Sequence, residues 1–347
     1  MFLEKLGADA RVAGLFRPHA GEGIELGRVS FASHEQYRIY LENGECDGAG
    51  TGRLRWSDDL PAVGDWVVAQ RVDPHLALIE AVLPRRTKFS RRASGRDVAE
   101  QVLAANIDLA VIVAGLDGDF NLRRIERYLV LVREGGAGPV IVLNKADLCN
   151  SVQDNIDAVS RIAGGAPVLA LSARTNVEPL ANIIDSRTLA LFGSSGAGKS
   201  TITNGLLRET RQPIGPVRLD DSRGRHTTTS RMLMPLPAGG AIIDNPGLRE
   251  LQLWASEDSL NQTFDEISSL AEGCKFPDCG HTVEPGCAVR EALENGTIEP
   301  LRWQGYCKLQ KELRYQLLQQ DVHARNAERK RWKAIEKALR NNPKHRR

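Results

Sequence analysis

Residues 193–200 read Gly193-Ser194-Ser195-Gly196-Ala197-Gly198-Lys199-Ser200, which fits the pattern GxxxxGK[ST] at every fixed position. The run follows an apolar, strand-like segment, Thr188–Phe192, and precedes Thr201–Leu207, which has helical spacing. Glycines in such a loop let backbone N–H groups point inward around a phosphate, and a helix N-terminus behind it favours negative charge. The sequence therefore predicts a phosphate-binding loop for a nucleoside triphosphate, from Gly193 to Thr201.

Two side chains of this loop carry the expected chemistry. Lys199 would neutralise the β- and γ-phosphates, and the Ser200 hydroxyl would ligate Mg²⁺. A chance glycine-rich turn is the alternative, but it would not explain a strand before the loop and a helix after it. We therefore assign Lys199 and Ser200 to nucleotide and magnesium binding.

The segments around the loop alternate between strand-like and helix-like patterns. Apolar runs are separated by stretches with helical spacing, for example Leu122 to Val132. Strands that alternate with helices predict a parallel α/β sheet with right-handed crossovers. The apolar runs are Leu109–Ala114, Pro139–Leu143, Val168–Leu171 and Thr188–Phe192, extended by Arg231–Pro235 and Ala241–Asp244.

A second motif, Asn144-Lys145-Ala146-Asp147, follows the apolar run Pro139–Leu143. The Asp147 carboxylate can accept hydrogen bonds from N1–H and N2–H₂ of guanine, whereas adenine presents an acceptor at N1. Asn144 can hold the loop in shape, and the stem of Lys145 can lie over the base. A polar site left unpaired by the wrong base rejects it by roughly 10⁴-fold. The motif predicts a guanine nucleotide.

A companion triplet, Ser172-Ala173-Arg174, follows the run Val168–Leu171. A backbone amide of Ser172 or Ala173 can donate to guanine O6. Alone the triplet would carry little weight, but its place after the next strand supports the guanine assignment.

A sensor of the γ-phosphate is expected where the run Ala241–Asp244 ends, because residues 244–247 have the DxxG form. Asp244 would reach Mg²⁺ through water, and the amide of Gly247 would meet the γ-phosphate. Upstream, residues 223–229 (RGRHTTT) suit a mobile switch with a hydroxyl for Mg²⁺. Any of the three threonines could supply it, and Thr228 is our candidate; a plain surface loop is the alternative.

The residue after DxxG bears on the mechanism. Many GTPases place there a glutamine that orients the attacking water, but this chain has Leu248, which can neither donate nor accept a hydrogen bond. Intrinsic hydrolysis should therefore be slow. Another residue or a partner would supply the missing group, and His226 and Arg249 are the candidates.

The first 85 or so residues have a β pattern, in which short alternating runs are separated by Gly, Pro, Asn and Asp. About five short strands suggest a small barrel such as the OB-fold. An unrelated small β-sandwich would give the same pattern. The expected strands include Gly27–Phe31, Gln36–Leu41, Gly52–Trp56 and Asp65–Gln70.

Four residues near the C-terminal end, Cys274, Cys279, His281 and Cys287, have the spacing C-x₄-C-x-H-x₅-C. Three thiolates and one imidazole suit a closed, tetrahedral Zn²⁺ site, which leaves no open position for catalysis. Unliganded buried cysteines beside a surface histidine are the alternative. We expect one structural zinc ion here and ordinary thiols at the other three cysteines.

Charge is unevenly distributed, although the net charge is only +2. Residues 301–347 hold 14 lysines and arginines against 4 aspartates and glutamates, so the rest of the chain is acidic. A basic tail indicates an anionic partner, of which nucleic acid is the commonest, although a solvated helix would look the same.

Composition excludes several classes of protein. Hydrophobic residues at 41% and charged residues at 26% are ordinary for a globular chain. The longest apolar stretch, near residues 109–116, is far shorter than the roughly 20 residues of a membrane span, and the N-terminus lacks the apolar core of a secretory signal. We expect a cytoplasmic protein with no membrane contact.

The order of the motifs is unusual, because the guanine motifs precede the phosphate loop, which in turn precedes the switch threonines and Asp244. In the usual small GTPase the phosphate loop comes first. A parallel sheet can be reopened at another connection while every strand keeps its neighbours, so the site survives such a circular permutation. Movements of the switches could then reach the flanking domains directly.

The permuted order and the cysteine cluster together resemble the bacterial ribosome small subunit-dependent GTPases, the RsgA family. The resemblance spans nearly the whole chain: the β region, NKAD, SAR, GSSGAGKS, GRHTTT, DNPG and the cluster. One departure is Asn245, where the family more often has threonine, at a variable position of DxxG. The resemblance implies an OB-fold, a circularly permuted GTPase domain, a zinc domain, and late maturation of the small (30S) ribosomal subunit, which stimulates hydrolysis.

We therefore expect an OB-like barrel at residues 1–88, a permuted GTPase domain at 89–255 and a zinc-binding, mainly helical domain at 256–347. The expected activity is hydrolysis of GTP to GDP and phosphate, with the small subunit and its rRNA as partners of a monomer. A GTP-regulated RNA-binding switch with little turnover is the alternative. A small-molecule kinase is disfavoured because no acceptor site is apparent.

Overall fold

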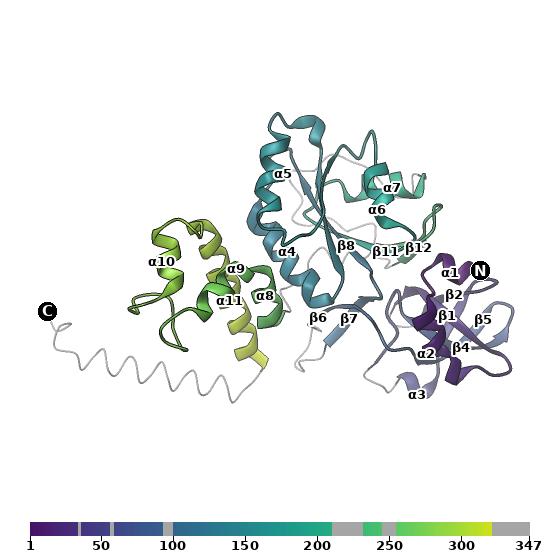
Figure 1. The fold of residues 1–347 in the computed structure, drawn as a ribbon. Coiled ribbons are helices and arrows are strands. Elements are labelled where there is room, and N and C mark those ends of the chain that lie inside the picture. The colour runs from purple at the N-terminus through teal and green to yellow at the C-terminus, as the bar shows by residue number, and fades with distance from the viewer. Residues whose placement is uncertain (34–35, 56–58, 93–99, 210–231, 245–254, 321–347) are drawn as a thin grey trace, which may run out of the picture. The chain divides into compact units, whose positions relative to one another are not determined.

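The computed structural model describes the chain except for residues 34–35, 56–58, 93–99, 210–231, 245–254 and 321–347. Contacts divide the chain into two compact units (Figure 1). The first comprises Met1–Arg92 with Glu100–Gln252, and the second comprises Leu253–Arg347 with Ala93–Ala99. His226, Thr228 and Gly247 of the predicted site lie outside the described residues, as does the basic run Arg325–Arg340.

The centre of the first unit is a sheet in the order β10-β9-β8-β11-β13-β12. The first five strands of this order are parallel, and β12 is antiparallel to β13. The parallel sheet predicted from the apolar runs is confirmed. Its strands are β8 (Leu109–Gly115), β9 (Gly138–Asn144), β10 (Val168–Leu171), β11 (Thr188–Phe192), β12 (Met232–Pro235) and β13 (Ala241–Asp244).

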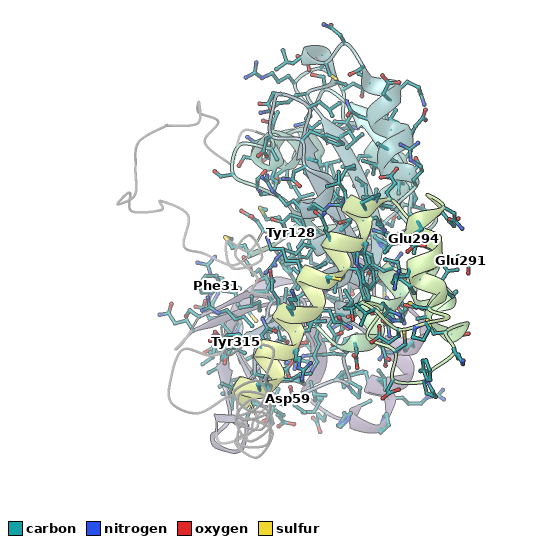
Figure 2. All side chains as sticks on the ribbon, turned by 90° about the vertical axis from the view of Figure 1, so that its left-hand side faces the viewer. Phe31, Asp59, Tyr128, Glu291, Glu294 and Tyr315 are labelled. Atoms are coloured by element: carbon teal, nitrogen blue, oxygen red, sulfur yellow. The ribbon has the colours of Figure 1, made fainter. Side chains whose placement is uncertain are left out.

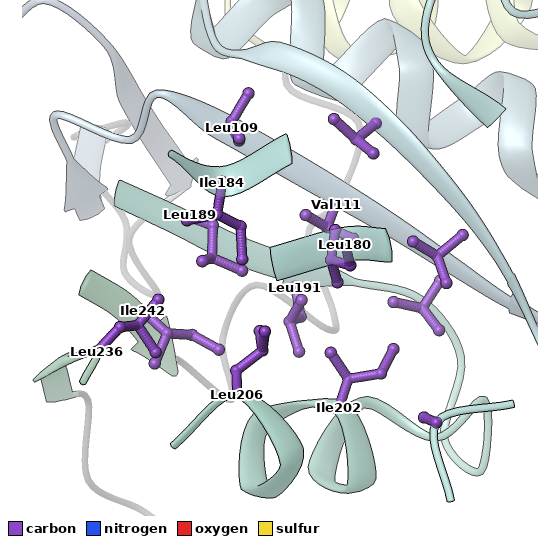
Figure 3. Close-up of a cluster of buried hydrophobic side chains, with 14 of the residues drawn as sticks. Leu109, Val111, Leu180, Ile184, Leu189, Leu191, Ile202, Leu206, Leu236 and Ile242 are labelled. Carbon is purple, nitrogen blue, oxygen red and sulfur yellow. The ribbon is translucent and has the colours of Figure 1, made fainter. Parts of the chain in front are cut away.

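Helices cover both faces of this sheet. On one face, Leu180 and Ile184 of α6 and Ile202 and Leu206 of α7 form a core with Leu189 and other strand residues (Figure 3). On the other face lies α4, whose C-terminal residues end on the left-handed Gly136. The helices are α4 (Leu122–Gly135), α5 (Val152–Ser160), α6 (Glu178–Ile184) and α7 (Lys199–Leu207), with the short turn η2 (Ala146–Leu148) after β9.

The N-terminal strands form a closed five-stranded barrel in the order β1-β2-β3-β5-β4, with β4 returning to pair with β1. Its core holds Val29, Ile39, Leu41, Val67 and Ile79, all fully buried. The predicted barrel is confirmed, against the sandwich. The strands are β1 (Ile24–Ala32), β2 (Tyr37–Leu41), β3 (Gly44–Gly50), β4 (Trp66–Asp73) and β5 (Leu76–Val82); the helices α1 (Phe2–Lys5) and α2 (Ala10–Phe16) and the turn η1 (Arg17–His19) precede them.

One predicted strand was wrong. Gly52–Arg55 of the expected strand Gly52–Trp56 forms the helix α3, and the third barrel strand is Gly44–Gly50. Glycines in GECDGAG read as turn signals. In the barrel, however, a Cβ at Gly48 would lie 3.2 Å from the Tyr37 Cβ, so a glycine there allows β2 and β3 to pack closely.

The barrel and the parallel sheet are continuous. Phe31 of β1 pairs antiparallel with Met232 of β12, which joins the two sets of strands into one eleven-stranded sheet. Because contacts place Met1–Arg92 and Glu100–Gln252 in one unit, the boundary expected between residues 88 and 89 stays a prediction.

A buried arginine reinforces this junction. Arg28 of β1 is 1% exposed and donates to the carbonyls of Leu6 and Asn106, the latter at 3.2 Å. Its guanidinium lies 4.7 Å from the centre of the Trp66 ring. Burial lowers the pKa of Arg28 to about 10, so the side chain remains charged at neutral pH. The carbonyl oxygens of Leu6 and Asn106 and the face of the Trp66 ring stabilise the buried positive charge of this side chain.

A basic segment, Arg85-Arg86-Thr87-Lys88, connects the barrel to the sheet, and its two arginines are neutralised inside the unit. Arg85 pairs with the buried Asp65 at 2.7 Å, and Arg86 pairs with Asp108 at 2.6 Å. The strand β6 (Lys88–Arg92) then pairs with β7 (Glu100–Ala105) in a separate two-stranded sheet. These arginines stabilise the fold.

The described part of the second unit is helical, as the sequence predicted. Its helices are α8 (Glu257–Thr263), α9 (Asp265–Glu272), α10 (Ala288–Glu294) and α11 (Pro300–Gln320). Arg302 of α11 lies over the ring of the buried Phe264 at 4.0 Å and pairs with Glu266 at 2.6 Å, which fixes α11 against α8 and α9. Figure 2 shows the exposed Glu291 and Glu294 on α10. Among the described helices, none is long and apolar enough to cross a membrane.

Candidate functional site

The predicted phosphate loop leaves the buried strand β11 and enters α7. Gly193 has φ +142°, and a Cβ there would lie 2.2 Å from the Val113 carbonyl oxygen. Gly198, the N-cap of α7, has φ +100°, and a Cβ there would lie 2.0 Å from Asn144 Nδ2. Both positions therefore require glycine, for backbone conformation and for space.

The ammonium group of Lys199 lies inside this loop. Lys199 is 7% exposed, and its Nζ donates to the carbonyl of Gly193 at 2.7 Å and to that of Ser194. A buried cation held by neutral carbonyls is well suited to receive an anion. Ser195 and Gly196 are exposed at the tip of the loop, and Ser200 and Thr201 are partly buried in the first turn of α7.

Asn144 links the phosphate loop to the second guanine motif. Its Nδ2 donates to the Ala197 carbonyl at 2.8 Å, and its Oδ1 accepts from the Ala173 N–H at 2.9 Å. Asn144, at the end of β9, is 3% exposed. One buried amide therefore holds together three segments that are far apart in the sequence.

The remaining predicted groups lie at the same edge of the sheet. Lys145 follows β9 with φ +63° and forms an ion pair with Asp117. Asp147 is exposed in η2, Ser172 follows β10 and Asp244 ends β13. The carboxyl ends of parallel strands are the usual position of a ligand in such sheets.

Two carboxylates at this edge were missed by the sequence analysis, Asp117 and Asp119, which follow β8. Asp119 accepts a hydrogen bond from the Ser194 hydroxyl and pairs with Arg124 at 2.7 Å. Burial raises the pKa of Asp119, but the hydrogen bonds from Ser194 and Arg124 outweigh that effect and hold the pKa below its usual value. No motif marks these residues; their position between the ends of β9 and β11 is the only signal.

The predicted metal ligands converge in the second unit. One ligand atom from each of Cys274, Cys279, His281 and Cys287 lies within 4.8 Å of all the others. His281 Nδ1 is 3.5 Å from the Cys274 sulfur and 3.4 Å from the Cys287 sulfur. This donor set is of the kind that closes around a tetrahedral metal ion, so the group can hold a metal.

The pKa shifts of Cys279 and His281 also agree with metal binding by this group. The pKa of Cys279 is raised to about 11 by loss of hydration and by the neighbouring thiols Cys274 and Cys287. Burial lowers the pKa of His281, which favours its neutral, ligating form. A cation in the middle would remove the repulsion between the three thiolates. Backbone N–H groups of Gly280, Thr282, Val283 and Glu284 hold the pKa of Glu284 at about 2, and they order the turn that carries His281.

The strand order and the motifs at its edge define a class, the circularly permuted GTP hydrolases. A family model described as RsgA GTPase matches residues 82–254. The chain is 47% identical over 96% of its length to the small ribosomal subunit biogenesis GTPase RsgA of Opitutus terrae, of which 96% is covered. The protein belongs to the RsgA GTPase family.

Two solved structures share the fold. YjeQ from Thermotoga maritima is 26% identical, with a TM-score of 0.64 over 84% of this chain and 98% of that one. YloQ, described as a circularly permuted GTPase, is 25% identical, with a TM-score of 0.62 over 86% of this chain and 98% of that one. The circular permutation predicted from the order of the motifs is confirmed.

Proposed function

We propose that this protein hydrolyses GTP to GDP and phosphate in the maturation of the small ribosomal subunit. The proposal rests on the two hydrogen bonds of Asn144, which join the phosphate loop at Ala197 to the guanine motif at Ala173. The names of the relatives point to the small subunit and disfavour a switch without turnover.

The expected reaction is the attack of water on the γ-phosphorus with departure of GDP. Lys199 and the N–H groups of residues 193–201 stabilise the charge on the phosphates, while Asp147, Lys145 and the amides after Ser172 hold guanine. Mg²⁺, when bound, would neutralise the phosphate oxygens; Ser200, Asp244 and Thr228 are the residues proposed to hold it. Gly247 is assigned to the γ-phosphate and His226 to the water.

Leu248 implies that a partner contributes to the orientation of the attacking water. Its side chain cannot orient water, so the isolated protein should turn over slowly. We propose that the 30S subunit supplies or orders the missing group.

The partner surfaces follow from charge and fold. The basic residues of 321–347 would contact rRNA phosphates, and the barrel at residues 1–88 would add a second RNA surface. The permuted domain would occupy residues 89–255, and the domain at 256–347 would hold one structural Zn²⁺ at Cys274, Cys279, His281 and Cys287. We further propose a cytoplasmic monomer.

The direct test is the GTPase rate of the full chain with and without purified 30S subunits. We expect the rate to rise by about 1000-fold or more when subunits are added, within the range known for catalytic groups that a partner supplies. A rate that is slow and unchanged by subunits would favour the RNA-binding switch instead. Transfer of phosphate to an acceptor other than water would favour a kinase.

The preference of the protein for guanine nucleotides tests the role proposed for Asp147. Asp147→Asn should lower the preference for GTP over xanthosine triphosphate by about 100-fold, because an amide can donate to the xanthine O2 where the carboxylate accepts from guanine N2–H₂. Competition binding with both nucleotides measures the ratio. Asp154→Asn, an exposed change on α5, is the matched control. An unchanged ratio in Asp147→Asn would refute the assignment.

A further inference from the structure

The loop between β8 and α4, residues 116–121, contains two carboxylates that none of the nucleotide motifs includes. Asp117 pairs with Lys145, and Asp119 accepts from the hydroxyl of Ser194. Lys145 belongs to the guanine motif and Ser194 to the phosphate loop. The two carboxylates are therefore bonded to the two ends of the pocket proposed above.

Asp119 is itself held in place. Arg124, in the first turn of α4, donates to its carboxylate at 2.7 Å, and Asn121 caps α4 by accepting from the Arg124 N–H. One turn further along α4, the centre of the Tyr128 ring lies 6.4 Å from that of Phe192, the residue directly before the phosphate loop. The start of α4 thus lies against the strand that leads into the phosphate loop.

Asp117 contacts the guanine-binding end of the proposed pocket, through its ion pair with Lys145. The ion pair leaves both side chains only partly exposed, 25% for Lys145 and 29% for Asp117. A Cβ at Gly115, at the end of β8, would lie 2.6 Å from Asp117 Oδ1 and 3.7 Å from Lys145 Nζ. The glycine therefore leaves the space beside the strand end to this ion pair.

We propose that residues 116–121 are a positioning loop for the nucleotide, in which Asp119 fixes the phosphate loop through Ser194 and Asp117 fixes Lys145 over the base. The inference rests on the proposed nucleotide pocket. Each carboxylate holds its partner side chain in place before the nucleotide binds, so less conformational freedom is lost on binding. Each carboxylate therefore raises the affinity without touching the nucleotide. The two contributions are independent, because they act on different segments.

Double-mutant cycles with GDP affinity as the readout test this proposal. Asp119→Asn and Ser194→Ala should each weaken GDP binding about 10-fold, as expected for one charge-assisted hydrogen bond, and the double variant should be no weaker than either single one. Asp117→Asn should also weaken GDP binding about 10-fold, and it should cause no further loss in Lys145→Ala, which removes the contact with the base itself. Combining Asp119→Asn with Asp117→Asn should multiply the losses, to about 100-fold.

The controls separate this inference from the proposed function. Asp154→Asn should bind GDP as the unchanged protein does, and thermal unfolding without nucleotide reports whether each variant is folded. If Asp119→Asn does not fold, the partly exposed Ser194→Ala decides. Normal GDP affinity in Ser194→Ala, or losses that multiply within a pair, would overturn the positioning loop. Failure of the unchanged protein to bind GDP would instead refute the proposed pocket.

Discussion

Removal of the metal should unfold the second unit and leave the first unit folded. The ligand atoms of Cys274, Cys279, His281 and Cys287 converge within 4.8 Å, and the helices α8, α9 and α10 are only seven or eight residues long. Helices of that length are not stable alone, and structural zinc contributes folding free energy directly. Amide exchange protection in residues 256–318 should fall by about 100-fold or more after chelation or in Cys274→Ser.

Cys307→Ser, in the same unit, is the matched control for Cys274→Ser. Cys307 lies on α11 outside the cluster, so Cys307→Ser should keep both the metal and the protection. Metal analysis of the purified chain should give one zinc ion per molecule in the unchanged protein and in Cys307→Ser, and none in Cys274→Ser. Equal protection of residues 256–318 with and without chelator would contradict a structural role.

Lys199→Ala should reduce single-turnover GTP hydrolysis by about 100- to 1000-fold, the usual effect of removing one charge-stabilising group. Lys199 Nζ lies among the carbonyls of the phosphate loop, so its loss removes the buried cation and also loosens the loop. Lys5→Ala, an exposed change, should leave the rate unchanged. A Lys199→Ala protein that is folded and hydrolyses GTP at the normal rate would refute the assigned pocket.

The sequence predicted those parts of the fold that local pattern determines. The apolar runs of β8, β9 and β11 gave the parallel sheet, since strands buried on both faces are continuously apolar. The cysteine spacing gave the metal-binding group because close ligands need only a turn between them.

Other parts depend on contacts that no local pattern contains. β3 was missed because Gly48, which packs against Tyr37 inside the strand, has the same sequence signal as Gly44, which closes the turn between β2 and β3. The ion pairs of Arg85 and Arg86 could not be found from sequence, because Asp65 and Asp108, which neutralise them, come from other segments. Asp117 and Asp119 could not be found from sequence because their partners, Lys145 and Ser194, are brought to them only by the order of the strands.

The hydrogen-bonded pair between Phe31 and Met232 has a consequence for how the protein would respond to its nucleotide. Met232 also pairs with Asp244, the residue proposed to sense the metal and the γ-phosphate. A single residue of β12 therefore stands between that carboxylate and the first strand of the barrel. A displacement of Asp244 would therefore shift β12 and, through it, β1. The position of the barrel's surface would then differ between the GTP-bound and the GDP-bound protein.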